Sequence, residues 1–178
     1  KVVSTSDRFV SELRFGLYNT YWISGGALKL SAQTVQELRE AVWRGDALIM
    51  DGVHDSRNQL LHPVAGVKQN GKLPQRDQIV NIPAGSVFTP GALPTLGQPT
   101  RFDLMGGHSQ ALFTQVPGNQ GDVPAIVSHR HGAGSSMLFA FDLAAMLQAN
   151  AIPGSAQLRD LIAVTASQGT TNPATLTA

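Results

Sequence analysis

The 178-residue chain contains no cysteine, which excludes disulfides, thiolate metal sites and thiol nucleophiles. Charged residues make up only 14% of the sequence and the net charge is +1, so no broad field favours binding to nucleic acid or to an anionic membrane. No window approaches the roughly 20 apolar residues that a membrane-spanning helix needs. The sequence also lacks a phosphate-binding loop with its lysine, and we expect no cofactor. The absence of thiols favours an extracytoplasmic location, periplasmic or secreted.

The length and the local composition predict one domain followed by a linker. We expect an α/β domain over residues 1–165, interrupted at 66–120 by an irregular insertion that is rich in glycine and proline and mostly β. Residues 166–178 are small and polar, which is typical of a linker. We therefore interpret the chain as one module of a larger, exported bacterial protein, with the neighbouring domains as its partners.

The order of hydrophobic patterns predicts a parallel sheet. An aromatic and β-branched run at 18–24 is followed by a helix that Ser31 can cap and then by a short apolar strand at 47–50. Further on, runs at 124–128 and 136–141 flank a glycine-rich turn and predict a C-terminal hairpin. We expect a mostly parallel, flavodoxin-like sheet flanked by helices. In such sheets, ligands bind at the carboxyl ends of the strands.

Several polar or glycine residues follow these strands and define a candidate pocket. They lie after the first strand, after the second strand, and after the last strand of the hairpin: Gly25, Gly26, His54, Asp55, Arg57 and Asp142. The guanidinium of an arginine presents a planar fork that matches a carboxylate. The pocket therefore predicts a small anionic or sugar-like ligand.

The segment at 52–61, Gly-Val-His-Asp-Ser-Arg-Asn-Gln-Leu-Leu, resembles the nucleophile elbow of class I glutamine amidotransferases. His54 stands where that family has its catalytic cysteine, and Ser56 replaces a glycine of the motif. The strand and Gly-Gly turn at 18–26 are similar to the family's oxyanion segment, and Asp142 lies near the position of its catalytic histidine. The resemblance implies a glutamine amidotransferase-like fold in a non-catalytic member, similar to the trimerisation domain of bacterial β-galactosidases.

The main interpretation is therefore a non-catalytic structural or interaction domain with a vestigial pocket. One alternative is a hydrolase with a rebuilt site, using His54, Asp55 and Ser56 or a metal, although adjacent residues on a turn usually point apart. The sequence His129-Arg130-His131 puts two imidazoles on one face of a strand, and Asp51 lies at a strand end, but zinc needs three or four converging ligands. We expect no metal. A third hypothesis is self-association through the insertion, which the trimerisation resemblance suggests.

Overall fold

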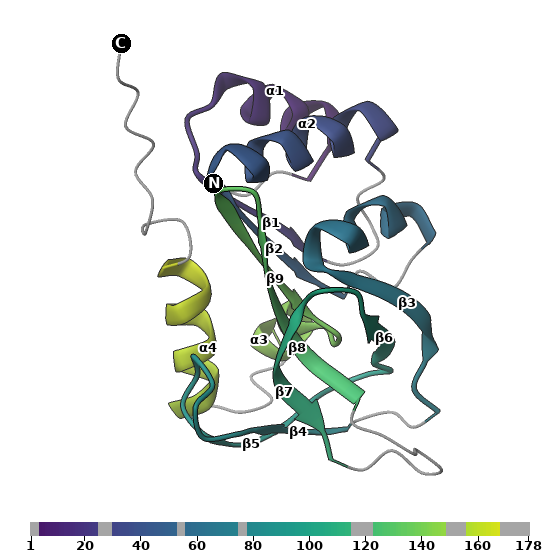
Figure 1. Cartoon of the computed structure of the whole chain (residues 1–178), viewed down its shortest axis with the longest axis vertical. Helices are drawn as coiled ribbons and strands as arrows, with labels where there is room; N and C mark the ends of the chain where they lie inside the picture. The colour runs from purple at the N-terminus through teal and green to yellow at the C-terminus, as the bar shows by residue number, and fades with distance from the viewer. Residues whose placement is uncertain are drawn as a thin grey trace.

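The computed structural model describes residues 4–24, 30–52, 56–74, 78–114, 123–148 and 156–167. The elements labelled in Figure 1 are, in chain order, α1 (Ser6–Phe15), β1 (Thr20–Ser24), α2 (Ala32–Arg44), β2 (Ala47–Asp51), the 3₁₀ helix η1 (Ser56–Ala65), β3 (Val67–Lys72), β4 (Ile79–Ile82), β5 (Gly91–Pro94), β6 (Thr100–Leu104), β7 (His108–Phe113), β8 (Val123–His131), β9 (Gly134–Phe139), α3 (Leu143–Gln148) and α4 (Ala156–Ser167).

Seven of these strands form one mixed sheet, in the order β1-β2-β9-β8-β7-β4-β5, and β3 pairs with β6 in a separate ribbon. The pairs β1–β2 and β2–β9 are parallel. The remaining pairs of the large sheet are antiparallel. The sheet curls strongly into a half-barrel, and β4 and β5 run across the end opposite to α1 and α2 (Figure 1).

The prediction of a mostly parallel, flavodoxin-like fold is therefore wrong. The alternation of strand and helix covers only β1, α2 and β2, and the chain then enters short strands that pair antiparallel. The predicted insertion at 66–120 does not lie wholly outside the sheet, because β4, β5 and β7 pair within it, whereas β3 and β6 form the separate ribbon. The hairpin of β8 and β9 joins the two halves, since β9 is parallel to β2 on one side and antiparallel to β8 on the other.

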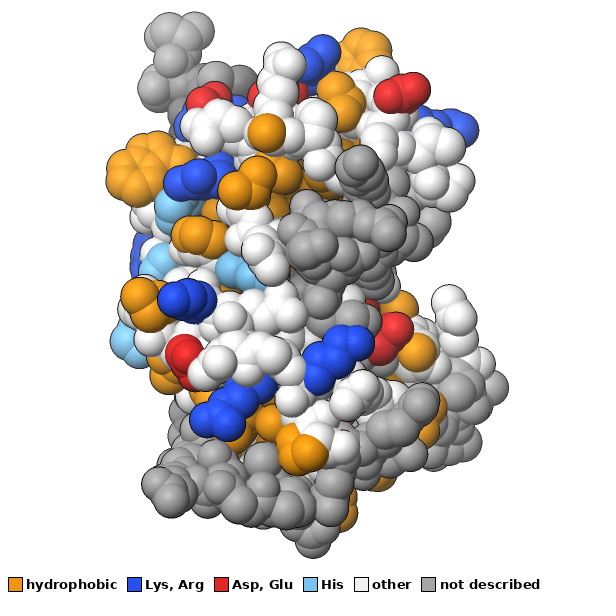
Figure 2. All heavy atoms as spheres, turned by 90° about the vertical axis from the view of Figure 1, so that its right-hand side faces the viewer, with side chains coloured by type: hydrophobic (Ala, Val, Ile, Leu, Met, Phe, Trp, Pro, Cys, Tyr) orange, Lys and Arg blue, Asp and Glu red, His pale blue; other side chains and the backbone are white. Residues whose placement is uncertain are grey.

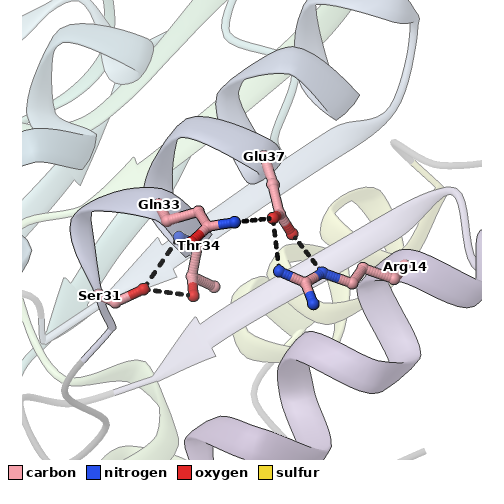
Figure 3. Close-up of polar contacts among 5 residues, drawn as sticks. All are labelled: Arg14, Ser31, Gln33, Thr34 and Glu37. Carbon is pink, nitrogen blue, oxygen red and sulfur yellow. Dashed lines mark hydrogen bonds and ion pairs between the residues drawn. The ribbon is translucent and has the colours of Figure 1, made fainter.

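Helix α2 begins where its sequence predicts, directly after Ser31. The hydroxyl of Ser31 accepts a hydrogen bond from the backbone N–H of Thr34 at 3.1 Å, which satisfies one of the free donors of the first turn (Figure 3). The buried stripe of the helix faces the sheet and consists of Thr34, Val35, Leu38, Ala41 and Val42. On the exposed side, Glu37 forms an ion pair with Arg14 of α1 at 2.7 Å. Helices α1 and α2 thus lie side by side over one end of the sheet (Figure 1).

Strand β2 lies at the centre of the parallel half, and all five of its residues are buried. Burial on both faces explains why the strand is a continuous apolar run that ends in one acid, Asp51. The hairpin packs closely against the end of α2, because a methyl group at Gly134 would overlap the carbonyl oxygens of Val42 and Asp46. Only glycine fits at this position.

Within the described part of the chain, no helix combines the length and the apolar character needed to cross a membrane.

Candidate functional site

The carboxyl ends of β1, β2 and β9 meet at one edge of the sheet. In the register of these strands, Ser24 lies beside Asp51, and Asp51 lies beside Phe139. Three residues after Phe139, Asp142 precedes helix α3. Parallel strand ends of this kind are where α/β proteins place their ligands, and this edge is therefore the candidate site.

Most of the residues that the sequence predicts for the pocket lie outside the described part of the structure. Gly25, Gly26, His54 and Asp55 lie outside the described residues, and so does the side chain of Arg57. Asp142 is described, and it lies at the predicted edge of the sheet. The pocket as a whole stays a prediction.

The central group of the edge is the carboxylate of Asp51, which is completely buried. Its Oδ1 atom accepts a hydrogen bond from the hydroxyl of Ser24 at 3.0 Å, and its Oδ2 atom accepts one from the indole N–H of Trp22. The backbone N–H of Ala144, in α3, also donates to the carboxylate. Asp51 therefore ties together β1, β2 and α3, and we call these four residues the Asp51 brace.

Burial raises the pKa of Asp51 to about 6, because the charged form loses its hydration. The nearby carboxylate of Asp142 raises the pKa further, while the hydrogen bonds from Trp22, Ser24 and Ala144 act in the opposite direction. Asp142 is itself engaged, since its Oδ1 atom accepts a hydrogen bond at 2.7 Å from the backbone N–H of Ala145 and so caps α3. The site thus contains two neighbouring acids, of which one takes up a proton near neutral pH.

Glycoside hydrolysis also uses two neighbouring carboxyl groups, one as the acid and the other as the base or nucleophile. In this chain, however, both oxygens of Asp51 already have partners and none of its surface is exposed. A substrate would have to displace Trp22 or Ser24 before it could reach the acid. The geometry fits a structural role better than proton transfer to a substrate.

From its sequence position Asp51 was considered only as a metal ligand, and the brace was not predicted. The available signal was an acid that directly ends an apolar strand, a position that needs hydrogen-bond donors if it is buried. The donor from Trp22 comes from 29 positions earlier in the sequence, and no local pattern marks that contact.

The two histidines of β8 do lie on one face, as predicted, with ring centroids 6.3 Å apart. The Nδ1–H group of His129 donates a hydrogen bond of 2.8 Å to the carbonyl oxygen of Val64, and the ring of His131 lies edge-on to Trp43. Across the residues that the structure describes, no three His, Cys, Asp or Glu side chains come together as a metal site would require.

A concavity lies between η1 and the β3–β6 ribbon. It has a volume of about 410 Å³ and is lined by Gln59, His62, Pro63, Val67, Lys68, Gln69 and Met105. The ring of His62 is not directed at this space alone, because it packs edge-on against the buried ring of Phe102 at 5.2 Å. No sequence pattern predicted this concavity.

No protein-family model matches the sequence, and no curated protein matches it. Among solved structures, α-L-fucosidase isoenzyme 2 from Paenibacillus thiaminolyticus has a TM-score of 0.61 at 14% identity, over 87% of this chain and 25% of the fucosidase chain. A β-galactosidase from the haloarchaeon Halorubrum lacusprofundi has a TM-score of 0.60 at 15% identity, over 86% of this chain and 22% of that one. The cytoplasmic protein STM1381 from Salmonella typhimurium LT2 has a TM-score of 0.60 at 18% identity, over 94% and 76% of the two chains.

These similarities concern the fold, and the chain spans about a quarter of the length of the two glycosidases. They support the part of the sequence interpretation that pointed to bacterial β-galactosidases, since β-galactosidase chains are among the structures with this fold. They do not support the glutamine amidotransferase-like assignment. That assignment is wrong, because the sheet is a mixed, β-rich half-barrel and the similar structures include glycoside hydrolases.

Proposed function

We propose that the chain is a non-catalytic accessory module of a larger carbohydrate-active protein. The observation that carries the proposal is the state of Asp51, the acid at the strand ends, which is fully buried and has both carboxylate oxygens occupied by donors of the chain itself. Catalytic acids need a free path to the substrate oxygen. The fold supports the carbohydrate context, because it forms about a quarter of each of the two glycosidase chains described above.

A second candidate function is a hydrolase that uses Asp51 and Asp142 as its acid pair. The similarity to glycosidases favours a link to hydrolysis more directly than it favours an inert domain. The raised pKa of Asp51 and the closeness of Asp142 also suit an acid and a base. We rank this candidate second because the brace closes off the acid. The version with His54, Asp55 and Ser56 stays a prediction, since those side chains lie outside the described residues.

The remaining sequence predictions concern the context of the module. An extracytoplasmic location, contacts with neighbouring domains of the same protein and self-association all stay predictions. The vestigial pocket can be tested by thermal shift with small carboxylates and sugars on the wild type and on a His54→Ala, Arg57→Ala double variant. Equal shifts of the melting temperature in both proteins would contradict ligand binding at this pocket.

The proposed function is tested by turnover. The purified chain is incubated with chromogenic aryl β-galactoside, β-mannoside and α-L-fucoside, beside Asp51→Asn and Asp142→Asn variants. Asparagine also caps helices, so Asp142→Asn retains the cap of α3. We expect no release of the aryl group above the buffer rate from any of the three proteins. Turnover by the wild type that disappears in a folded Asp51→Asn variant would instead establish the hydrolase.

A further inference from the structure

An exposed tryptophan near the end of α2 packs against the β8–β9 turn. The side chain of Trp43 is 62% exposed. The underside of its ring rests on the β8–β9 turn, where a methyl group on Gly132 would come within 2.6 Å of the ring atom Cδ2. The carbonyl of Trp43 accepts a hydrogen bond at 2.9 Å from the backbone N–H of Ala133 in the same turn. The indole is therefore held in place by the hairpin while much of its surface faces solvent.

One histidine contacts this ring, a second histidine lies beside the first, and an arginine precedes the tryptophan on the same helix. His131 lies edge-on to Trp43, with centroids 5.5 Å apart, and His129 lies beside His131. Arg39 precedes Trp43 by one turn of α2. Burial lowers the pKa of His131, and the charges of Arg39 and His129 lower it further. A neutral imidazole offers one donor and one acceptor, which suits the hydroxyl groups of a ligand.

Arg39 brings a donor that the described part of the chain leaves unused. Its Nε atom is buried and has no hydrogen-bond partner, and its guanidinium forms no ion pair with any described residue. Arg39 as a whole is only partly buried, so a ligand from solvent contacts the accessible part of its side chain rather than Nε. A carboxylate is the acceptor that best matches the guanidinium fork.

Figure 2 shows histidine, cationic and hydrophobic side chains side by side on one face of the molecule. We propose that the surface formed by Arg39, Trp43, His129 and His131, called here the Trp43 surface, binds an acidic saccharide. The apolar face of a pyranose ring stacks on the indole, the carboxylate of a uronic acid pairs with Arg39, and His131 contacts a hydroxyl group. This site lies at the opposite end of α2 from the strand edge with Asp51 and is separate from it.

Three features select this ligand class over others. The indole ring provides a flat apolar contact at little entropic cost, and its N–H group is a hydrogen-bond donor. These two properties match the apolar face and the hydroxyl groups of a sugar. The free guanidinium favours an acidic sugar over a neutral one. A metal is not favoured, because among the described residues two imidazoles meet here and no third His, Asp or Glu joins them. The proposal rests on the carbohydrate context proposed above and adds the class of sugar.

The test follows the indole N–H signals of the chain by NMR, since the sequence has only two tryptophans, Trp22 and Trp43. A Trp43→Phe variant assigns the two signals. The probes are trimers of galacturonate, mannuronate and guluronate, with galactotriose and mannotriose as neutral counterparts. We expect a saturable shift of the Trp43 signal, but not of the Trp22 signal, and at least tenfold tighter binding of one or more uronate trimers than of either neutral trimer.

Variants then separate the two contacts. Trp43→Ala should weaken binding of the uronate trimer at least tenfold. Arg39→Gln should remove the preference for the acidic sugar, and Arg39→Lys, which keeps the charge but loses the fork, should retain only part of it. Arg8→Gln and Phe15→Ala change an exposed arginine and an exposed aromatic residue on α1 and serve as controls that bind like the wild type.

The proposal is overturned if no uronate trimer shifts the Trp43 signal at about 5 mM, a concentration that detects even millimolar affinity. It is equally overturned if neutral and acidic trimers bind alike, or if Trp43→Ala binds as well as the wild type. Hydrolysis of aryl glycosides would contradict the non-catalytic function but not this site. Absence of both turnover and uronate binding would contradict only the site.

Discussion

Trp22 of the edge strand β1 donates its indole N–H to the carboxylate of Asp51 at the end of β2, which joins a 38% exposed side chain to a fully buried acid. Ser24, two residues further along β1, donates to the other oxygen of the same carboxylate. Because alternate residues of a strand point to the same side, both donors reach the acid from one face of β1. The acid therefore holds the end of a strand that, among the described residues, pairs with a neighbouring strand on one side only.

The raised pKa of Asp51 predicts a dependence of stability on pH. In the folded chain the pKa is about 6, whereas the ordinary value is 3.8, so the folded state binds this proton more tightly than the unfolded state. This contribution to stability is complete below about pH 4 and is lost as the pH rises through 6, which amounts to roughly 2–3 kcal/mol.

The Asp51→Asn variant has no titrating group at position 51, so it should not show this loss of stability with rising pH. Urea unfolding between pH 4 and 7 should therefore show the stability of Asp51→Asn rising relative to that of the wild type as the pH increases. Asp103→Asn, at an exposed position, serves as the control. A constant difference between Asp51→Asn and the wild type across this range would contradict the raised pKa.

The contact between the hairpin and α2 predicts a large cost for a single methyl group. Gly134→Ala should destabilise the chain by about 3 kcal/mol or more, because the new methyl overlaps two backbone carbonyls that cannot move without shifting α2. Gly16→Ala is the matched comparison, since Gly16 has open space around it and a φ of 62°, so that only backbone strain of about 1–2 kcal/mol arises. Similar unfolding midpoints for the two variants would argue against the close approach.

Two of the polar contacts drawn in Figure 3, one at Ser31 and one at Arg14, should differ in their effect on stability. Ser31→Ala removes the acceptor for the N–H of Thr34 and should cost about 1 kcal/mol. Arg14→Gln breaks the exposed ion pair with Glu37 and should be hard to distinguish from the wild type, because water screens the charges. Chemical denaturation of both variants checks the order, and a larger loss for Arg14→Gln would reverse it.

The local elements near the N-terminus could be predicted from the sequence because their signals are local. The cap at Ser31 and the apolar stripe of α2 are confirmed, and the two-residue spacing of His129 and His131 correctly placed both rings on one face. The hairpin could be anticipated for the same reason, since apolar runs flank a glycine turn.

The direction of the other strands could not be predicted. Strands β4 and β5 have only four residues each, in a segment rich in glycine and proline, and so short a pattern does not show which strand will be the neighbour. The short motif around His54 suggested a parallel fold, but a motif of ten residues does not determine how residues 78–131 pair. The brace at Asp51 depends on contacts across 27 and 29 positions and was equally hidden.

The most direct test of a structural role for Asp51 is a titration of its carboxyl carbon by NMR, with Asp51→Asn used to assign the signal. The titration is run with and without saturating galactotriose or a uronate trimer. We expect a midpoint near pH 6 that is the same in both samples, since the carboxylate is occupied by the chain and is closed to ligands. A midpoint that moves when the sugar is added would show contact with the ligand and would contradict the structural role.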